Sequence, residues 1–178
     1  MFTNTSSLWD NTLYLTHTLY LHIHIHTIQD WELQAATLKK QGDTSFSTGD
    51  YSSAIKHYTS AISIDDSNAV LYSNRAACLL KVNERSRALR DGERCVELKP
   101  DWGKGYGRKA AAQFSLKRYE AAADTYREGL AKDPDNKALK EGLNDAKRKA
   151  REAEEEEQRR KEEEQRKEVR GVGDHDTS

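Results

Sequence analysis

The chain contains 178 residues, of which 35% are hydrophobic and 33% are charged, and its formal net charge at pH 7 is −1. This length predicts one domain with additional segments at its ends. The balanced charge excludes a general attraction to nucleic acid or to an anionic membrane surface, and no apolar run reaches the length of a membrane span.

Residues 1–30 contain no lysine or arginine and have the composition of a low-complexity segment. On an extended strand, His22, His24 and His26 would lie on one face, where neutral imidazoles can bind zinc or copper. Runs of His, Ile, Thr and Tyr also arise from repetitive coding sequence without selection for structure. We therefore predict a disordered leader over residues 1–30 and no metal site.

A repeat with a period of 34 residues occupies the middle of the chain. When the sequence is shifted by this period, four sets of positions with special packing roles coincide. These sets are Leu38, Tyr72 and Tyr106; Gly42, Ala76 and Ala110; Ala54, Ala88 and Ala122; and Ala61, Cys95 and Gly129. Three repeats follow, at residues 35–68, 69–102 and 103–136, within a globular segment over 31–146.

Each repeat has the pattern of two helices joined by a turn. Apolar or small residues recur at spacings of three and four, as in "AATLKKQGDTSFSTG" and "DYSSAIKHYTSAISI", which is typical of a helix that buries one face. The small residues allow neighbouring helices to approach closely. We expect Tyr58 and Tyr126 to fill the space beside them, and Gly92 to leave the equivalent space empty. Pro100 and Pro134 follow the second helix of their repeats, where proline ends a helix.

The segment "GKGYGRKAAA", residues 103–112, could form a phosphate-binding loop or a helix. A phosphate loop of the Gly-Lys type follows a strand and continues with Ser or Thr, and this segment has neither feature. In the repeat register it begins the first helix of the third repeat, with Tyr106 and Ala110 toward the core. We therefore predict a helix.

The residues after the repeats predict a capping helix that begins at 137, in which Leu139, Leu143 and Ala146 belong to one apolar stripe. Residues 147–168 are almost purely Glu, Arg, Lys and Gln, with acidic residues four positions before basic ones. Pairs of this kind support a solvated helix, while the missing apolar seam disfavours a coiled coil. Residues 169–178 are predicted to be a disordered tail.

The recurrence of these positions in three consecutive units resembles the tetratricopeptide repeat family. The resemblance implies an all-α fold in which three helical hairpins and a capping helix stack as a right-handed superhelix, extended here by the charged helix. No nucleophile–base pair or metal-ligand cluster accompanies the repeats. We therefore predict a binding module with no cofactor, and no enzyme.

The first helices of the repeats contain five polar residues of interest, of which Asn74 and Arg108 share one repeat position: Lys39, Asp43, Asn74, Lys104 and Arg108. Within a helix, residues four apart share a face, as Lys39 and Asp43 do, and likewise Lys104 and Arg108. Taken one by one, such residues more often solvate an exposed helix face. In the tetratricopeptide family the first helices line the concave side, so the resemblance implies that the five converge in a groove. Cations and amide donors gathered there would bind a carboxylate.

Three longer stretches, "VLYSNRAA", "LKPDWGKGYGRKAAA" and "YREGLAKDPDNKALKEGL", resemble the carboxylate-clamp domains of the adaptors that link heat shock protein 70 to heat shock protein 90. The resemblance covers about residues 35–146. It implies that Lys39, Asn74, Lys104 and Arg108 hold the acidic carboxyl-terminal Glu-Glu-Val-Asp peptide of one or both chaperones. It also implies a cytoplasmic, monomeric co-chaperone adaptor. A scaffold for internal peptides, and the targeting domain of a larger enzyme, remain open alternatives.

The two cysteines, Cys78 and Cys95, have neither metal-ligand spacing nor the pattern of a disulfide framework. They are predicted to be small buried packing residues of a protein from a reducing compartment. Trp102, beside Pro100, is predicted to anchor the junction between repeats.

One clamp position departs from the family. The family has Asn within "KGN", whereas this chain has Asp43 within "KKQGDTSF". An amide can donate to a carboxylate, but an ionised Asp offers only acceptors. Losing a donor and adding a like charge should cost about 2 kcal/mol, on the order of thirtyfold in affinity, unless Lys39 neutralises part of the charge.

Asp43→Asn is therefore expected to tighten the binding of a peptide that ends in Glu-Glu-Val-Asp, because it restores an amide donor and removes a negative charge. Isothermal titration calorimetry of the two proteins with one peptide measures the difference. Equal affinities would mean that Asp43 does not face the ligand.

Overall fold

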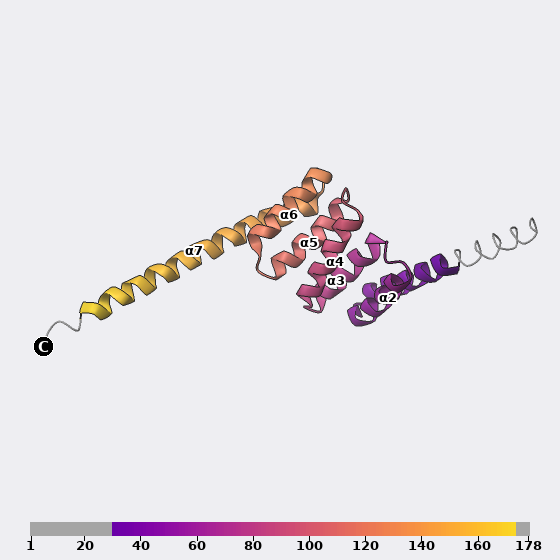
Figure 1. Ribbon diagram of the computed structural model, residues 1–178, viewed down its shortest axis with the longest axis horizontal. Coiled ribbons are helices and arrows are strands. Elements are labelled where there is room, and N and C mark those ends of the chain that lie inside the picture. Colours follow the sequence, from indigo (N-terminus) through magenta and orange to yellow (C-terminus); the bar gives the residue numbers. More distant parts are fainter. Residues whose placement is uncertain (1–29, 174–178) are drawn as a thin grey trace, which may run out of the picture.

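The computed structural model describes residues 30–173, and every regular element in that range is a helix (Figure 1). A first helix covers residues 30–47. It is followed by α2 (Tyr51–Ile64), α3 (Ala69–Lys81), α4 (Arg85–Leu98), α5 (Gly103–Ser115), α6 (Tyr119–Lys132) and α7 (Lys137–Gly173). The first six helices form three hairpins, and α7 follows them. The predicted all-α fold is confirmed, and the segment "GKGYGRKAAA" is the start of α5.

The predicted leader lies outside the described residues, except that Asp30 begins the first helix. The histidines at 22, 24 and 26 are also outside them, so the leader's disorder and its lack of a metal site stay predictions. Among the helices of the described range, none is both long and apolar enough to cross a membrane.

The turn inside each hairpin places one residue in the left-handed backbone region, at the same position of the repeat. Gly49 has φ 81°, Asn83 has φ 65° and Lys117 has φ 62°. Glycine adopts this conformation without strain and asparagine tolerates it, whereas lysine adopts it at some cost. In the first and third hairpins an aromatic pair also packs edge to face across the turn, with ring centroids 5.5 and 5.2 Å apart. The local sequence therefore reverses the chain at the same point of every repeat.

The first helices of successive hairpins lie side by side. Helix α3 contacts α5 as well as α4, and α5 contacts α7 as well as α6. The stacking depends on small residues, since Ala54, Ala76, Ala88, Ala110 and Ala122 are all fully buried. Side chains on matching faces of the first helices are consequently brought to one side of the stack, which is the condition for a shared groove.

The expectation that Gly92 leaves an empty space is wrong. A Cβ at Gly92 would lie 2.6 Å from the Lys109 Cα, so the backbone of α5 itself occupies that space. Tyr58 does fill the space beside Gly42, where a Cβ would lie 2.7 Å from its ring, and Tyr126 packs against Gly142 in the same manner. Glycine at 92 therefore permits a closer approach between α4 and α5 than a tyrosine would.

The capping role of α7 is visible in its first turns. Leu139 and Ala146 are buried in one cluster with Tyr126, Ala110 and Ala122, and Leu143 packs against that cluster. The cap thus covers the apolar face that the third hairpin would otherwise expose.

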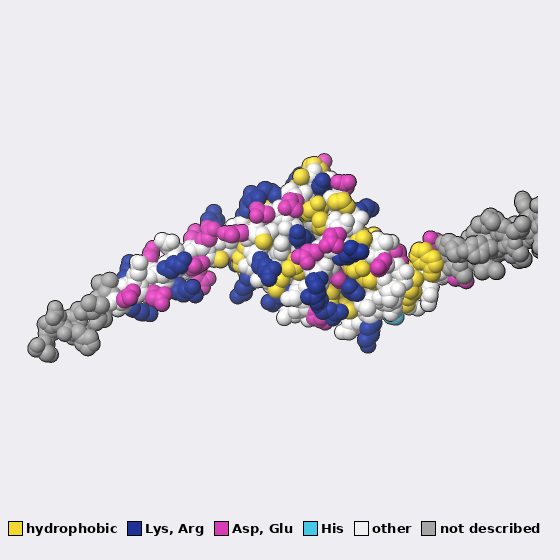
Figure 2. Space-filling model, in the orientation of Figure 1, with side chains coloured by type: hydrophobic (Ala, Val, Ile, Leu, Met, Phe, Trp, Pro, Cys, Tyr) yellow, Lys and Arg dark blue, Asp and Glu magenta, His cyan; other side chains and the backbone are white. Residues whose placement is uncertain are grey.

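Helix α7 continues without a break through the charged segment and projects beyond the stacked hairpins, with basic and acidic side chains interspersed along it (Figures 1 and 2). Lys161 pairs with Glu157 at 2.7 Å, and Lys167 pairs with Glu163 at 2.8 Å. The helix extends to Gly173. The prediction of a disordered tail is therefore wrong for residues 169–173. The reason is local, because Gly171 is the first glycine after Gly142 and the segment between them has no proline.

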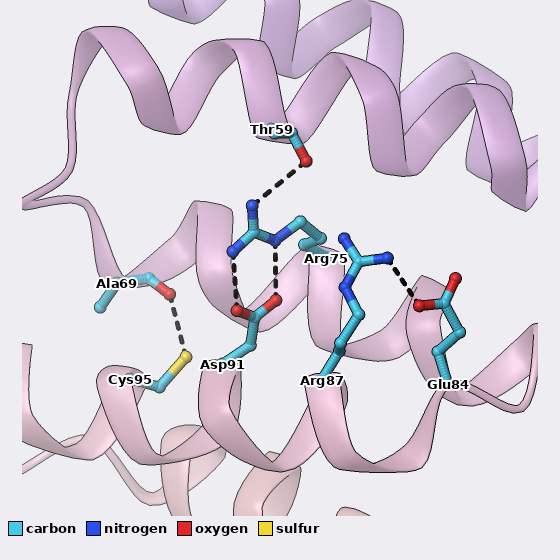
Figure 3. A network of polar contacts seen from close by, with 7 residues as sticks. All are labelled: Thr59, Ala69, Arg75, Glu84, Arg87, Asp91 and Cys95. Atoms are coloured by element: carbon cyan, nitrogen blue, oxygen red, sulfur yellow. Dashed lines mark hydrogen bonds and ion pairs between the residues drawn. The ribbon is translucent and has the colours of Figure 1, made fainter.

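A buried ion pair between α3 and α4, with a hydrogen bond to α2, connects three helices (Figure 3). The guanidinium of Arg75 on α3 donates to both carboxylate oxygens of Asp91 on α4, through Nε at 2.8 Å and Nη2 at 2.7 Å. A third bond, from Nη1 to the hydroxyl of Thr59 on α2, is 3.1 Å long. The Arg75 and Asp91 side chains are only 15% and 7% exposed, so each needs the other as a partner.

Asp91→Ala is expected to lower the free energy of unfolding by about 3–5 kcal/mol, because it leaves the Arg75 charge buried and unpaired. Chemical denaturation followed by circular dichroism measures the loss. Arg87→Ala removes an exposed ion pair, whose side chains are 45% and 41% exposed, and should cost no more than about 1 kcal/mol. Equal losses in the two variants would contradict a structural role for the buried pair.

Both cysteines are fully buried and unpaired, as the sequence predicts. The Cys95 thiol donates to the carbonyl oxygen of Ala69 at 3.3 Å (Figure 3). Burial raises the pKa of Cys78 to about 11, and burial together with the nearby Asp91 charge raises the pKa of Cys95 to about 12. Because the thiolate is the reactive form, neither thiol has the properties of a nucleophile.

In the native protein neither cysteine is expected to react with a chromogenic thiol reagent at about pH 8, where an exposed thiol is substantially ionised. Both should react after denaturation, which supplies the control for reagent and protein concentration. Rapid modification of one thiol in the folded protein would contradict its burial.

Candidate functional site

The predicted site residues come from three helices that stand next to each other in the stack. Lys39 and Asp43 lie on the first helix, Asn74 lies on α3, and Lys104 and Arg108 lie on α5. Hydrogen bonds link the first helix to α3, and another links α3 to α5. After burial and the Arg108 charge, the charges of Lys39 and Asp43 also act on the pKa of Lys104, so the five residues lie in one region of the stack, called here the polar surface.

Asp43 is the centre of the first half of this surface. Its Oδ2 accepts a hydrogen bond from the Lys39 ammonium at 2.6 Å. Its Oδ1 accepts from the Tyr58 hydroxyl at 2.6 Å and from the Asn74 amide nitrogen at 3.2 Å. One carboxylate thus collects donors from the first helix, α2 and α3.

The donors keep Asp43 ionised. Partial burial by itself raises the pKa of the carboxyl, but the hydrogen bonds from Lys39, Tyr58 and Asn74 and the Lys39 charge outweigh burial, so the pKa lies below its ordinary value. In the opposite direction, burial and the bond to Asp43 raise the pKa of Tyr58. At neutral pH the site contains an Asp43 anion and a Tyr58 phenol that donates to it.

Lys104 and Arg108 form the second half of the surface. Burial, followed by the charge of Arg108, lowers the pKa of Lys104, and burial lowers the pKa of Arg108. Arg108 Nε lies 3.4 Å from the Ser73 hydroxyl, a long contact with a neutral group. Within residues 30–173 neither cation forms an ion pair with a carboxylate. Two like charges that are partly removed from water attract an anion more strongly than exposed ones do.

Trp102 stands beside the second half, at the N-cap of α5. The ammonium groups of Lys99 and Lys104 lie 5.5 and 5.7 Å from the centre of its ring. The predicted anchor at the repeat junction therefore also contacts a residue of the polar surface, and a cation over an indole face is a favourable arrangement.

Two residues of the site were not predicted as part of it. Tyr58 was given a packing role only, although a buried tyrosine hydroxyl needs a hydrogen-bond partner, and that requirement was the available signal. Ser73 is fully buried next to Asn74, and nothing in the repeat pattern singled it out. A pocket at the other end of the site, next to Lys39, has a partly apolar lining that includes Trp31, Ala35 and Leu71.

The chain is similar to several known proteins. Residues 40–68 match the tetratricopeptide repeat family model. Over 112 residues the chain is 48% identical to the Hsp70-Hsp90 organizing protein of Triticum aestivum, a match that covers 63% of this chain and 19% of the relative. The chain spans about a fifth of the length of the curated relatives it matches.

Solved structures agree with the sequence matches. The Sgt2 TPR domain from Aspergillus fumigatus superposes with a TM-score of 0.66 at 31% identity, covering 68% of this chain and 82% of that one. The second TPR domain of human RPAP3, solved in complex with the HSP70 peptide SGPTIEEVD, gives a TM-score of 0.63 at 30% identity and covers 66% and 98%. Together with the three stacked hairpins, these matches show that the chain belongs to the tetratricopeptide repeat family.

Proposed function

We propose that the groove binds an acidic carboxyl-terminal peptide of the Glu-Glu-Val-Asp type, from heat shock protein 70, heat shock protein 90 or both. The chain would then act as a non-catalytic co-chaperone adaptor in the cytoplasm. The observation that carries this proposal is the pair Lys104 and Arg108, an exposed and a half-buried cation without an ion-pair partner among the described residues. Relatives whose names include Hsp70 and Hsp90, and a related domain bound to an HSP70 peptide, support it.

The chemistry of the groove agrees with such a ligand. Carboxylates form their strongest hydrogen bonds with guanidinium and ammonium groups, and each bond of this kind contributes about 1.5–3 kcal/mol. Lys104 and Arg108 are one helical turn apart on one face of α5, so both can contact one group without a change of the backbone. Trp102 offers apolar surface beside Lys104, whereas the pocket next to Lys39 combines apolar residues with the acidic Glu32 and Asp65.

Lys104→Ala and Arg108→Ala are each expected to weaken binding of a peptide ending in Glu-Glu-Val-Asp by roughly tenfold to a hundredfold, the loss of one charge-assisted hydrogen bond. Fluorescence polarisation of a labelled peptide measures the affinity. Lys56→Ala on α2 and Arg90→Ala on α4, both exposed, are the matched controls and should leave it unchanged. Titrations with the endings of heat shock protein 70 and of heat shock protein 90 will show which is preferred.

Circular dichroism spectra establish that each variant is folded. If both α5 variants bind as tightly as the unmodified protein, the ligand site lies elsewhere and the proposed function fails.

A further inference from the structure

The first half of the polar surface already holds a carboxylate, and it is the protein's own. Asp43 accepts from the Lys39 ammonium and from the Asn74 amide, a cation and an amide donor of the kind that would bind a ligand carboxylate. Lys39 lies 2.6 Å from Asp43, so its charge is compensated locally. The second half, at Lys104 and Arg108, forms no ion pair with a carboxylate among residues 30–173, although the more distant Asp43 charge partly offsets the lowering of the Lys104 pKa by burial and by Arg108.

We propose that Asp43 serves as an internal carboxylate that occupies the Lys39 and Asn74 half of the groove and leaves one ligand-carboxylate site, at Lys104 and Arg108. This inference rests on the proposed function and specifies its ligand. The groove selects an acidic segment that presents a single carboxylate, from a side chain or from a chain end. A free chain terminus is therefore not required in addition to an acidic side chain.

The contacts around Asp43 resist its displacement by a ligand. Asp43 and Lys39 are four residues apart on one helix, so their pairing needs no long-range rearrangement. Tyr58 provides a further donor from α2 and is itself almost fully buried, with 1% of its surface exposed. A second ligand carboxylate would have to break these hydrogen bonds and would be repelled by the Asp43 charge, and both effects disfavour its binding.

Asparagine at position 43 would free the Lys39 and Asn74 donors that Asp43 occupies. Its amide oxygen could still accept from Tyr58, while its amide nitrogen would donate to the ligand, and Lys39 would be released from its ion pair. The Lys39 and Asn74 half would then offer its donors to a second carboxylate. The number of ligand carboxylates that the groove reads thus depends on one side chain.

Four versions of one peptide separate the two halves; it ends in Gln-Gln-Val-Asp, so that its only carboxylates are the two at its last residue, and the Glu-Glu-Val-Asp peptide is titrated beside them. The first has both carboxylates at its last residue, the second has an amidated terminus, the third has Asn in place of the last Asp, and the fourth has both changes. Each is titrated into the unmodified protein, into Asp43→Asn and into Asp124→Asn. The last variant is the matched control, because it makes the same change of charge at an exposed site on α6.

The unmodified protein should bind the first three peptides within about threefold of one another and the fourth at least about tenfold more weakly, as expected for the loss of one charge-assisted contact. Asp43→Asn should bind the first peptide on the order of thirtyfold more tightly, and amidation should then cost it roughly tenfold. Asp124→Asn should match the unmodified protein throughout.

Two results would overturn the inference while the proposed function stands. One is a full amidation penalty in the unmodified protein equal to that in Asp43→Asn, because Asp43 would then leave the first half open. The other is binding to Asp43→Asn alone, because Asp43 would then block the whole groove and no single-carboxylate site would exist. A failure of every peptide to bind either folded protein would instead overturn the proposed function itself.

Discussion

Close approach between neighbouring helices is the constraint on which the rest of the structure depends. The fully buried alanines and the contact of Gly92 with the α5 backbone let each hairpin approach the next closely. Only at such separations can side chains from the first helix, α2 and α3 reach one carboxylate, as Lys39, Tyr58 and Asn74 do. Larger residues would widen the stack and separate the donors from Asp43.

Helix α3 connects the packing to the site. Three consecutive residues, Ser73, Asn74 and Arg75, contact three different helices: α5 through Arg108, the first helix through Asp43, and α4 through Asp91. The buried pair of Arg75 and Asp91 fixes α3 against α4 and, through Thr59, against α2. The network around Arg75 (Figure 3) thus holds in place the helix that carries Asn74, its neighbour in the chain.

The two ends of the polar surface differ in how their charges are compensated. At one end the Asp43 carboxylate accepts hydrogen bonds from the Lys39 ammonium, the Tyr58 hydroxyl and the Asn74 amide. At the other end, Lys104 and Arg108 are partly desolvated near a neutral hydroxyl and an indole ring. The proposed attachment of a ligand carboxylate at the α5 end rests on this difference, because neither cation there forms an ion pair within the described residues.

The sequence by itself determined the features that depend on the local spacing of residues, such as the helices and the faces they bury. The spacing of small and apolar residues predicted the hairpins, "GKGYGRKAAA" as a helix, the burial of both cysteines and the shared faces of Lys39 with Asp43 and of Lys104 with Arg108. These predictions succeed because a helix fixes which residues share a face, whatever it packs against.

The tertiary structure alone decided which side chains meet. The weakening effect of Asp43 on a clamp stays a prediction, and the structure adds its bonds to Tyr58 and Asn74, 15 and 31 residues away in the chain. The Arg75 and Asp91 pair and the tight packing at Gly92 were likewise invisible in the repeat pattern. Such contacts depend on the distance and rotation between stacked helices, which no single helix encodes.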